Sequence, residues 1–362
     1  MRLSTGLTLR ALVNEQSGVS DSTASLFQSN ATLETEDADG QIQTLVRTLE
    51  DGQKTKARVW VEFKPYELRR RATAPAPIVV ERVKSLAKLL AHAKAPDAGF
   101  RTLLCVAVVQ QQIPIQHRNI NRFSFAFELP EESFPAGPRG LLPLTLQQAI
   151  ESKSEIRPTL DERFKMATAV AQTVFELHSV HWLHKSIRSE NIFFGRETAG
   201  PDAYKAMYSR PFMVGFEFSR QQSDRSTTEQ DDRLERNIYR HPDRQGAPDD
   251  SARFTALHDI YALGVVLLEI GLWRSACGFE DYSNVDSHVI MHSLQDHARD
   301  RLPHYMGEAY TNAVLRCLEQ TLVEPEVAKK LILPEHKVQL LEVNMALSRE
   351  VVDEIKNGVK AT

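Results

Sequence analysis

The chain has 362 residues, 42% hydrophobic and 25% charged, which is enough for one large domain or two smaller ones with a sizeable core. Its net charge of −4 argues against a nucleic-acid partner and against general attraction to an anionic membrane. Three widely spaced cysteines indicate reduced thiols, not a disulfide framework or a zinc site. No apolar run reaches the about 20 residues that span a bilayer. We therefore expect a cytoplasmic protein without a transmembrane segment.

The beginning of the chain is polar and then changes to a strand pattern. Residues 1–41 are rich in Ser, Thr, Asn, Asp and Glu and predict a flexible leader. Residues 42–67 contain "RVWVEF", which has β-branched and aromatic content, and the dipeptide Asp51-Gly52, which is typical of a hairpin turn. We expect two antiparallel strands in this segment.

A helix and two further strands should complete a small first domain over residues 42–130. Residues 79–93 place Val79, Val83, Leu86 and Leu90 on one helical face. The segments "RTLLCVAVVQQ" (101–111) and "RFSFAFELP" (122–130) have the β-branched and aromatic content of strands. This part of the chain is therefore predicted to be rich in β-structure.

The remainder, residues 131–362, is predicted to be mostly helical. Residues 158–180 begin with the capping-box pair Thr159 and Glu162 and continue with apolar residues at helical spacing. "NIFF" (191–194) and "PFMVGF" (211–216) predict two short strands. Residues 256–273 are apolar nearly all round, which is typical of a buried central helix.

Five motifs in the chain resemble those of protein kinases in their order and spacing. They are "FAFELP" (125–130), "HKSIRSEN" (184–191), "GFEFSR" (215–220), "YRHPD" (239–243) and "DIYALGVVLLE" (259–269). In that order they resemble the hinge, the catalytic loop, the D-F-G segment, the Y-x-A-P-E anchor and the D-x-x-S-x-G helix of a kinase. Each motif alone is weak, but the ordered set is specific. The resemblance covers roughly residues 60–325.

The resemblance implies an α+β, bilobal protein-kinase-like fold. Its small β-rich N-lobe would be residues 42–130, and its larger α-helical C-lobe residues 131–362. More narrowly, the motifs resemble the kinase-like domains of fungal proteins that often carry an N-terminal HeLo (prion-inhibition-type) domain. That likeness implies a role in heteroincompatibility or regulated cell death. The leader of this chain is too short to hold a HeLo helical bundle, which departs from the family pattern.

The resemblance also implies a set of nucleotide-binding residues and makes ATP the implied cofactor. Backbone groups of Glu128 and Leu129 would contact adenine, and Lys64 would contact phosphate. Glu81, on the predicted helix, is the candidate ion-pair partner of Lys64. Asn191 would be a weak ligand of the second metal ion. For Lys64, a solvated lysine at a strand end is the equally simple alternative.

Two departures remove the chemistry of a kinase. Ser186 stands where the catalytic aspartate is expected, and a hydroxyl is neither basic nor anionic at neutral pH. Gly215 replaces the aspartate that ligates magnesium, and Mg²⁺ requires hard oxygen ligands, so the implied Mg²⁺ site is incomplete. Glu217 is a weak replacement ligand, the alternative being an exposed acid in an inert loop. No G-x-G-x-x-G loop precedes Lys64.

The residues that the resemblance retains are mainly architectural. His184 and Phe216 are expected to pack in the core of the helical part. Pro242 belongs to the anchor motif "YRHPD". Asp259 is expected to accept hydrogen bonds from the backbone around His184.

Three functions remain open from the sequence. The first is a pseudokinase that acts as a signalling or protein-interaction module with a protein partner. The second is a divergent, active ATP-dependent Ser/Thr protein kinase that uses Lys64, Asn191 and Glu217. The third is a purely structural partner-binding protein whose nucleotide pocket is filled by its own side chains, such as Phe125 and Phe127. Protection against heat by ATP and magnesium would distinguish them.

Overall fold

The computed structural model describes residues 26–27, 31–35, 41–48, 53–68, 74–91, 99–115, 118–135, 143–153, 155–200, 203–221, 233–245, 253–331 and 337–358. Two compact units can be separated. Unit 1 holds the described residues of Met1–Ala98, Thr102–Leu142 and Gly215–Phe218. Unit 2 holds those of Gly99–Arg101, Pro143–Val214 and Ser219–Thr362. The division differs from the predicted boundary at residue 130 mainly because Gly215–Phe218 joins the first unit.

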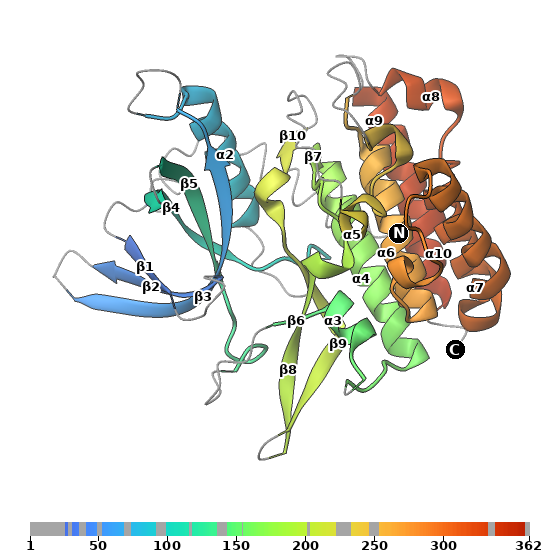
Figure 1. Ribbon diagram of the computed structural model, residues 1–362, viewed down its shortest axis with the longest axis horizontal. Coiled ribbons are helices and arrows are strands. Elements are labelled where there is room, and N and C mark those ends of the chain that lie inside the picture. Colours follow the sequence, from blue (N-terminus) through green and yellow to red (C-terminus); the bar gives the residue numbers. More distant parts are fainter. Residues whose placement is uncertain are drawn as a thin grey trace. The chain divides into compact units, whose positions relative to one another are not determined.

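Unit 1 contains a curled antiparallel sheet of five strands in the order β1-β2-β3-β5-β4 (Figure 1). The strands are β1 (Ala31–Thr35), β2 (Ile42–Thr48), β3 (Lys54–Tyr66), β4 (Cys105–Ile115) and β5 (Arg118–Glu128). Phe27 forms a parallel bridge with Val108 of β4, four residues before β1 begins at the opposite edge. The chain can connect both edges over so few residues only because the sheet curls.

The inside of the curled sheet is an apolar cluster to which all five strands contribute. It comprises Ala31, Leu45, Val59, Val61, Ala107, Val109 and Ala126, with Leu33, Phe63 and Val106 packed against them. The strands predicted in residues 42–67, 101–111 and 122–130 are therefore confirmed. The turn Asp51-Gly52 lies outside the described residues, although Thr48 and Lys54 on either side of it pair directly.

The predicted leader is wrong for residues 31–35, which form β1. Composition alone indicates a polar segment there, because "ATLET" carries one large apolar residue. Its alternation nevertheless matches the pleat of a strand, since Ala31 and Leu33 reach the apolar cluster. Pairing with β2 supplies the hydrogen bonds that this short segment lacks by itself. Most of the remaining leader lies outside the described residues.

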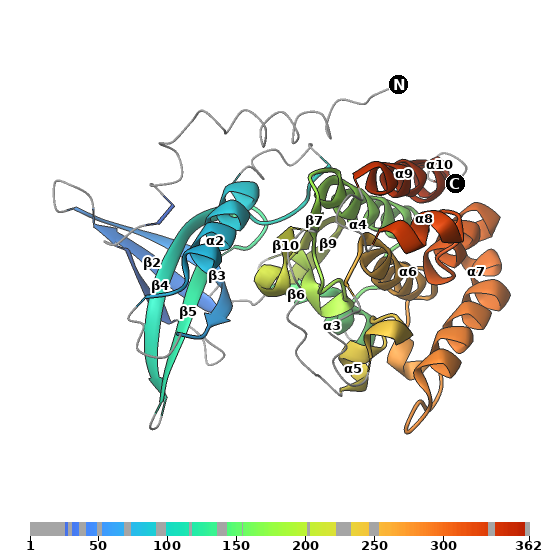
Figure 2. The ribbon, with the colours of Figure 1, turned by 90° about the horizontal axis from the view of Figure 1, so that it is seen from above.

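Helix α2 (Pro77–Leu90) packs against the sheet at β4, as Figure 2 shows. Proline is accepted at its first position, where the missing N–H would have no helical partner. Three of the four residues predicted to share its apolar face, Val83, Leu86 and Leu90, are fully buried. The helix predicted at residues 79–93 is thus confirmed over most of its length.

Unit 2 is mainly helical. Its helices are α3 (Leu146–Glu151), α4 (Leu160–Ser179), α5 (Leu234–Asn237), α6 (Ala256–Leu272), α7 (Ser287–Leu318), α8 (Pro325–Lys330), α9 (Lys337–Leu347) and α10 (Asp353–Gly358). The capping box predicted for Thr159 and Glu162 is present at α4. Helix α6 is buried nearly all round, as predicted, and packs against both α4 and α7 (Figure 1). None of the helices in the described residues is long and apolar enough to cross a membrane.

Short strands in unit 2 hold the loops that carry the sequence motifs. They are β6 (Leu144–Thr145), β7 (Trp182–Leu183), β8 (Ile192–Gly200), β9 (Ala203–Met213) and β10 (Arg220–Gln221). The two short strands predicted at 191–194 and 211–216 are confirmed over 192–194 and 211–213, which pair in the longer β8–β9 hairpin, whereas residues 214–216 follow the end of β9. β10 pairs with β7, which ties the chain after Phe218 to the strand that precedes His184.

Replacing Gly264 in α6 by alanine should lower the free energy of unfolding by about 1–3 kcal/mol. The new Cβ would lie 2.8 Å from Cys317 Cβ and 3.1 Å from Leu318 Cδ2. Alanine favours a helix by about 1 kcal/mol, so any net loss reports the close packing of α6 on α7. The control Gly278→Ala adds a Cβ with no atom within 4 Å and should be nearly neutral. Equal stability of both variants in urea unfolding would contradict this packing.

Candidate functional site

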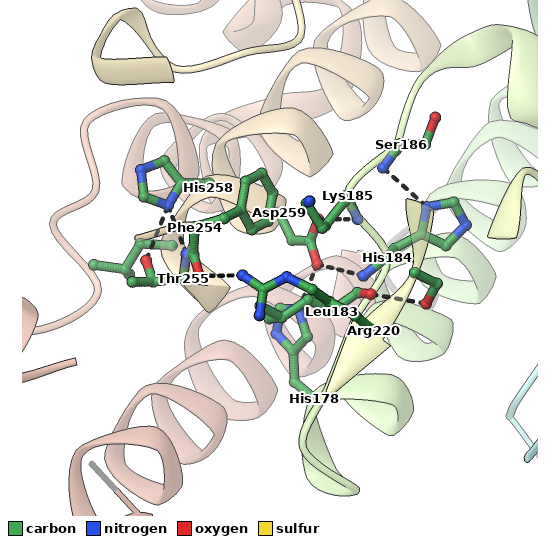
Figure 3. Close-up of polar contacts among 12 residues, drawn as sticks. His178, Leu183, His184, Lys185, Ser186, Arg220, Phe254, Thr255, His258 and Asp259 are labelled. Carbon is green, nitrogen blue, oxygen red and sulfur yellow. Dashed lines mark hydrogen bonds and ion pairs between the residues drawn. The ribbon is translucent and has the colours of Figure 1, made fainter. Parts of the chain in front are cut away.

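The backbone of the loop that begins at His184 is hydrogen-bonded to a buried carboxylate of helix α6. Asp259 accepts hydrogen bonds from the backbone N–H of His184 at 2.7 Å and of Lys185 at 2.8 Å (Figure 3). His178 of α4 lies 3.2 Å from the same carboxylate through Nε2. Both His184 and Asp259 are completely buried. The hydrogen bonds expected from Asp259 to this loop are therefore present.

The electrostatics of this loop keep Asp259 charged and His184 neutral. Burial by itself would raise the pKa of Asp259, but the hydrogen bonds and positive potential of its neighbours hold that pKa below the ordinary value. Burial lowers the pKa of His184 to about 4. Lys185, in contact with the same carboxylate, has a left-handed backbone with φ of 67°. The carboxylate thus holds a backbone conformation that a lysine rarely adopts.

Ser186 and Asn191 are hydrogen-bonded to each other within this loop. Asn191 Nδ2 donates to the Ser186 carbonyl at 2.8 Å and lies 3.1 Å from its Oγ. Ser186 is only 6% exposed. Neither side chain can act as a general base, because a serine hydroxyl and a carboxamide bind no proton at neutral pH. The Oδ1 atom of Asn191 is its remaining group of the kind that binds magnesium.

The anchor motif joins the same loop to helix α6. The hydroxyl of Tyr239 lies 2.7 Å from Ser189 Oγ and donates to the buried carboxyl of Glu269, 2.9 Å from Oε2. Pro242 is buried and opens the short 3₁₀ helix η3 (Pro242–Arg244). These contacts are architectural, since they consume the polar atoms of Tyr239 and Ser189 inside the fold.

In unit 1, a glutamate that was not among the predicted site residues is hydrogen-bonded to the backbone of the "GFEF" segment. Glu62 of β3 accepts from the N–H of Gly215 at 2.7 Å and from the N–H of Phe216 at 2.6 Å, one donor for each carboxyl oxygen. Gly215 has φ of 86°, a conformation that suits glycine and lets two successive amides point at one group. We call this arrangement the Glu62 clamp.

Burial is the main influence on the charge of the clamp. It raises the pKa of Glu62 to about 8, with the negative charge of Glu217 acting in the same direction and the two backbone amides opposing it. Glu62 is only 8% exposed. At neutral pH its carboxyl group is therefore largely protonated, and it is committed to the chain's own backbone.

Lys64 lies two residues beyond Glu62, on the same face of β3. Its Nζ donates to the backbone carbonyl of Glu217, within η2 (Phe216–Phe218). Glu81, the candidate ion-pair partner of Lys64, has a carboxylate that is 66% exposed and contacts Lys84 on its own helix at 3.0 Å. Glu81 is the fifth residue of α2, which begins at Pro77.

Among the backbone groups of Glu128 and Leu129 that were predicted to contact adenine, the two N–H groups already have partners. The N–H of Glu128 donates to the carbonyl of Leu104 at 2.9 Å, and the N–H of Leu129 to that of Arg58 at 3.4 Å. Earlier in the same strand, Phe127 pairs with Trp60 of β3, and Phe125 with Glu62. Bulky side chains thus lie on the face of the sheet that carries Trp60 and Glu62, because residues directly opposite in an antiparallel pair share a face.

A signal for the clamp was present in the sequence. In "RVWVEFK" the residues alternate, so Val59 and Val61 reach the apolar cluster while Trp60 and Glu62 lie on the other face. A carboxylate in the middle of such a strand needs hydrogen-bond donors when buried. The pattern cannot show which donors these are, because Gly215 and Phe216 lie 153 and 154 residues later in the chain.

Comparison with known proteins places most of the chain in one family. A family profile described as a domain of unknown function (DUF7580) matches residues 32–359, from β1 to α10. No curated protein matches the chain. Because the match includes both the Glu62 clamp and the loop held by Asp259, these features lie inside the family domain. The chain therefore belongs to the DUF7580 family, whose function is unknown.

Proposed function

We propose that this protein is a kinase-like module without phosphotransfer activity, which acts in signalling by binding another protein. The observation that carries the proposal is the Glu62 clamp. In the resemblance to kinases, Gly215 occupies the position of the magnesium-binding aspartate. Here that residue has no side chain, and its N–H and the next are bonded to Glu62. The donors that such a turn offers to an anion are therefore already taken.

Other groups that the resemblance assigns to a nucleotide are also engaged by the protein. Lys64 donates to the Glu217 carbonyl, and the N–H groups of Glu128 and Leu129 donate to other carbonyls of unit 1. Each would have to exchange an existing hydrogen bond for one to ATP, which reduces the gain on binding. This favours a module that binds no nucleotide over a divergent active kinase.

A protein partner is the ligand most consistent with this design. The fold keeps its buried network around Asp259, but the polar groups described above are hydrogen-bonded within the protein. They are therefore poorly placed to bind or convert a small molecule. The resemblance to the fungal HeLo-associated domains supports a cytoplasmic role in heteroincompatibility or cell-death signalling. We propose that the partner is a death-inducing protein supplied by a separate chain.

Millimolar ATP with magnesium should leave the melting temperature of the purified protein unchanged. A ligand present at 100 times its Kd would stabilise the fold by about 2.7 kcal/mol, which differential scanning fluorimetry detects readily. Incubation with radiolabelled ATP and generic substrates should likewise transfer no phosphate above the level of the Lys64→Ala variant.

The variant Ser186→Asp tests the same proposal from the opposite side. It restores the general base alone, and it should remain inactive because Gly215 still supplies no metal ligand. Labelling that depends on Lys64, or a magnesium-dependent melting shift that Lys64→Ala abolishes, would establish the divergent-kinase alternative instead.

A further inference from the structure

Three potential metal ligands meet at the start of helix α6. They are His241, Asp243 and His258, and their ligand atoms all lie within 4.8 Å of one another. His241 Nδ1 and Asp243 Oδ2 are 3.3 Å apart. Ligands bound to zinc at about 2.0–2.2 Å in tetrahedral geometry stand roughly 3.3 Å from each other. We propose that these three side chains bind a divalent first-row transition metal ion such as Zn²⁺.

The local fold brings the ligands together from two segments. Pro242 is the first residue of η3, so His241 directly precedes this helix and Asp243 is its second residue. His258 is the third residue of α6. The Asp243 side chain is 65% exposed and can move inward, while the His241 side chain is only 14% exposed and is held by its surroundings. Closing the site therefore requires movement mainly of a surface carboxylate.

Charged side chains surround the two imidazoles. Arg244 places a positive charge near the His258 ring, while the carboxylates of Asp243 and Asp259 act with the opposite sign. The carboxylate supplied by Asp243 offsets that positive potential when a cation binds.

The second nitrogen of His258 has a ready partner in either state. Its Nδ1 lies 2.9 Å from the N–H of Thr255 and 3.0 Å from Thr255 Oγ1 (Figure 3). Without metal, Nδ1 accepts from that N–H and completes a capping box, so the ring proton is on Nε2. With metal on Nε2, the Nε2 proton would be lost to solvent and Nδ1 would take up a proton, which it can donate to the threonine hydroxyl; the hydrogen bond from the Thr255 N–H to Nδ1 would then be given up. Such a hydrogen bond orients metal-binding histidines in general.

Two imidazoles and one carboxylate select the class of ion. Nitrogen-rich sites favour zinc, cobalt, nickel and iron over calcium and magnesium, which prefer oxygen ligands. Three protein ligands leave one position for water. The ion would join η3 to the first turn of α6, directly before Asp259, and so would brace the helix end that holds the His184 loop.

Titration of the full chain with Co²⁺ tests the site directly. Cobalt in a tetrahedral nitrogen and oxygen site absorbs visible light, so a saturable band at one equivalent is expected, together with its loss on adding Zn²⁺. Zinc should raise the melting temperature. His258→Gln should abolish both signals, and it keeps the helix cap because glutamine also serves in a capping box. Asp243→Asn, at an exposed position, should weaken binding at least tenfold.

The control is His304→Ala, which removes an exposed histidine elsewhere on α7 and should bind cobalt like the parent protein. Absence of a saturable band would overturn the proposal. So would cobalt binding that survives in both His258→Gln and Asp243→Asn, because the metal would then be held by other surface groups. Circular dichroism of each variant separates loss of binding from loss of folding.

Discussion

Asp259→Ala should lower the free energy of unfolding by about 3–5 kcal/mol, because it removes a buried charge that three donors share. The N–H groups of His184 and Lys185 would lose their acceptor, and His184 is completely buried. His178 would lose its partner as well. Urea unfolding followed by circular dichroism measures the change, and a variant that unfolds at the parent midpoint would contradict this role.

The control for this prediction is Asp300→Ala on α7, where the carboxylate is exposed and its loss should leave the transition unchanged. The direction of the pH effect follows from the pKa of Asp259, which lies below its ordinary value of 3.8. Its contribution to stability is present above that value and is lost as the pH falls through the folded-state pKa. The difference between parent and variant should therefore shrink only in strong acid.

Elements that depend on local patterns could be predicted from the sequence. The capping box at Thr159 and Glu162, the buried helix α6 and the strands around "RVWVEF" each follow from periodicity or from a short-range hydrogen bond. β1 could not, because "ATLET" becomes a strand only through pairing with β2 and packing of Leu33. The β8–β9 hairpin was underestimated since its outer half carries little apolar alternation.

Some features of the candidate site could likewise be predicted from the sequence, and others could not. Asp259 could be placed under the His184 loop because the spacing of two motifs in the chain resembled a known arrangement. The Glu62 clamp and the engaged N–H groups of Glu128 and Leu129 depend on tertiary contacts of the backbone, which a sequence does not display. Glu81 was a candidate partner of Lys64 from the resemblance alone. In the structure Lys64 donates to the Glu217 carbonyl, and the Glu81 carboxylate contacts Lys84.

Glu62→Gln should remove a large part of the pH dependence of stability between pH 4.5 and 8. In the parent protein, burial raises the pKa of Glu62 from 4.5 to about 8. A raised pKa means that the folded state holds a proton that the unfolded chain releases within this window. The stabilisation is therefore complete below about pH 4.5 and is lost as the pH rises through 8. A shift of this size corresponds to roughly 5 kcal/mol at most.

Unfolding free energies of parent and variant should be compared at several values between pH 5 and pH 8. The glutamine keeps one acceptor oxygen but turns its NH₂ group toward the second backbone N–H of the clamp. The variant should therefore have a lower free energy of unfolding than the parent protein in acid. The difference in unfolding free energy between parent and variant should narrow as the pH rises, because only the parent loses stability by ionising Glu62. Glu81→Gln, which alters an exposed carboxylate of α2, should leave the pH profile unchanged. A gap of constant size would mean that the amides of Gly215 and Phe216 hold Glu62 ionised throughout, and the clamp would then be a permanent buried anion.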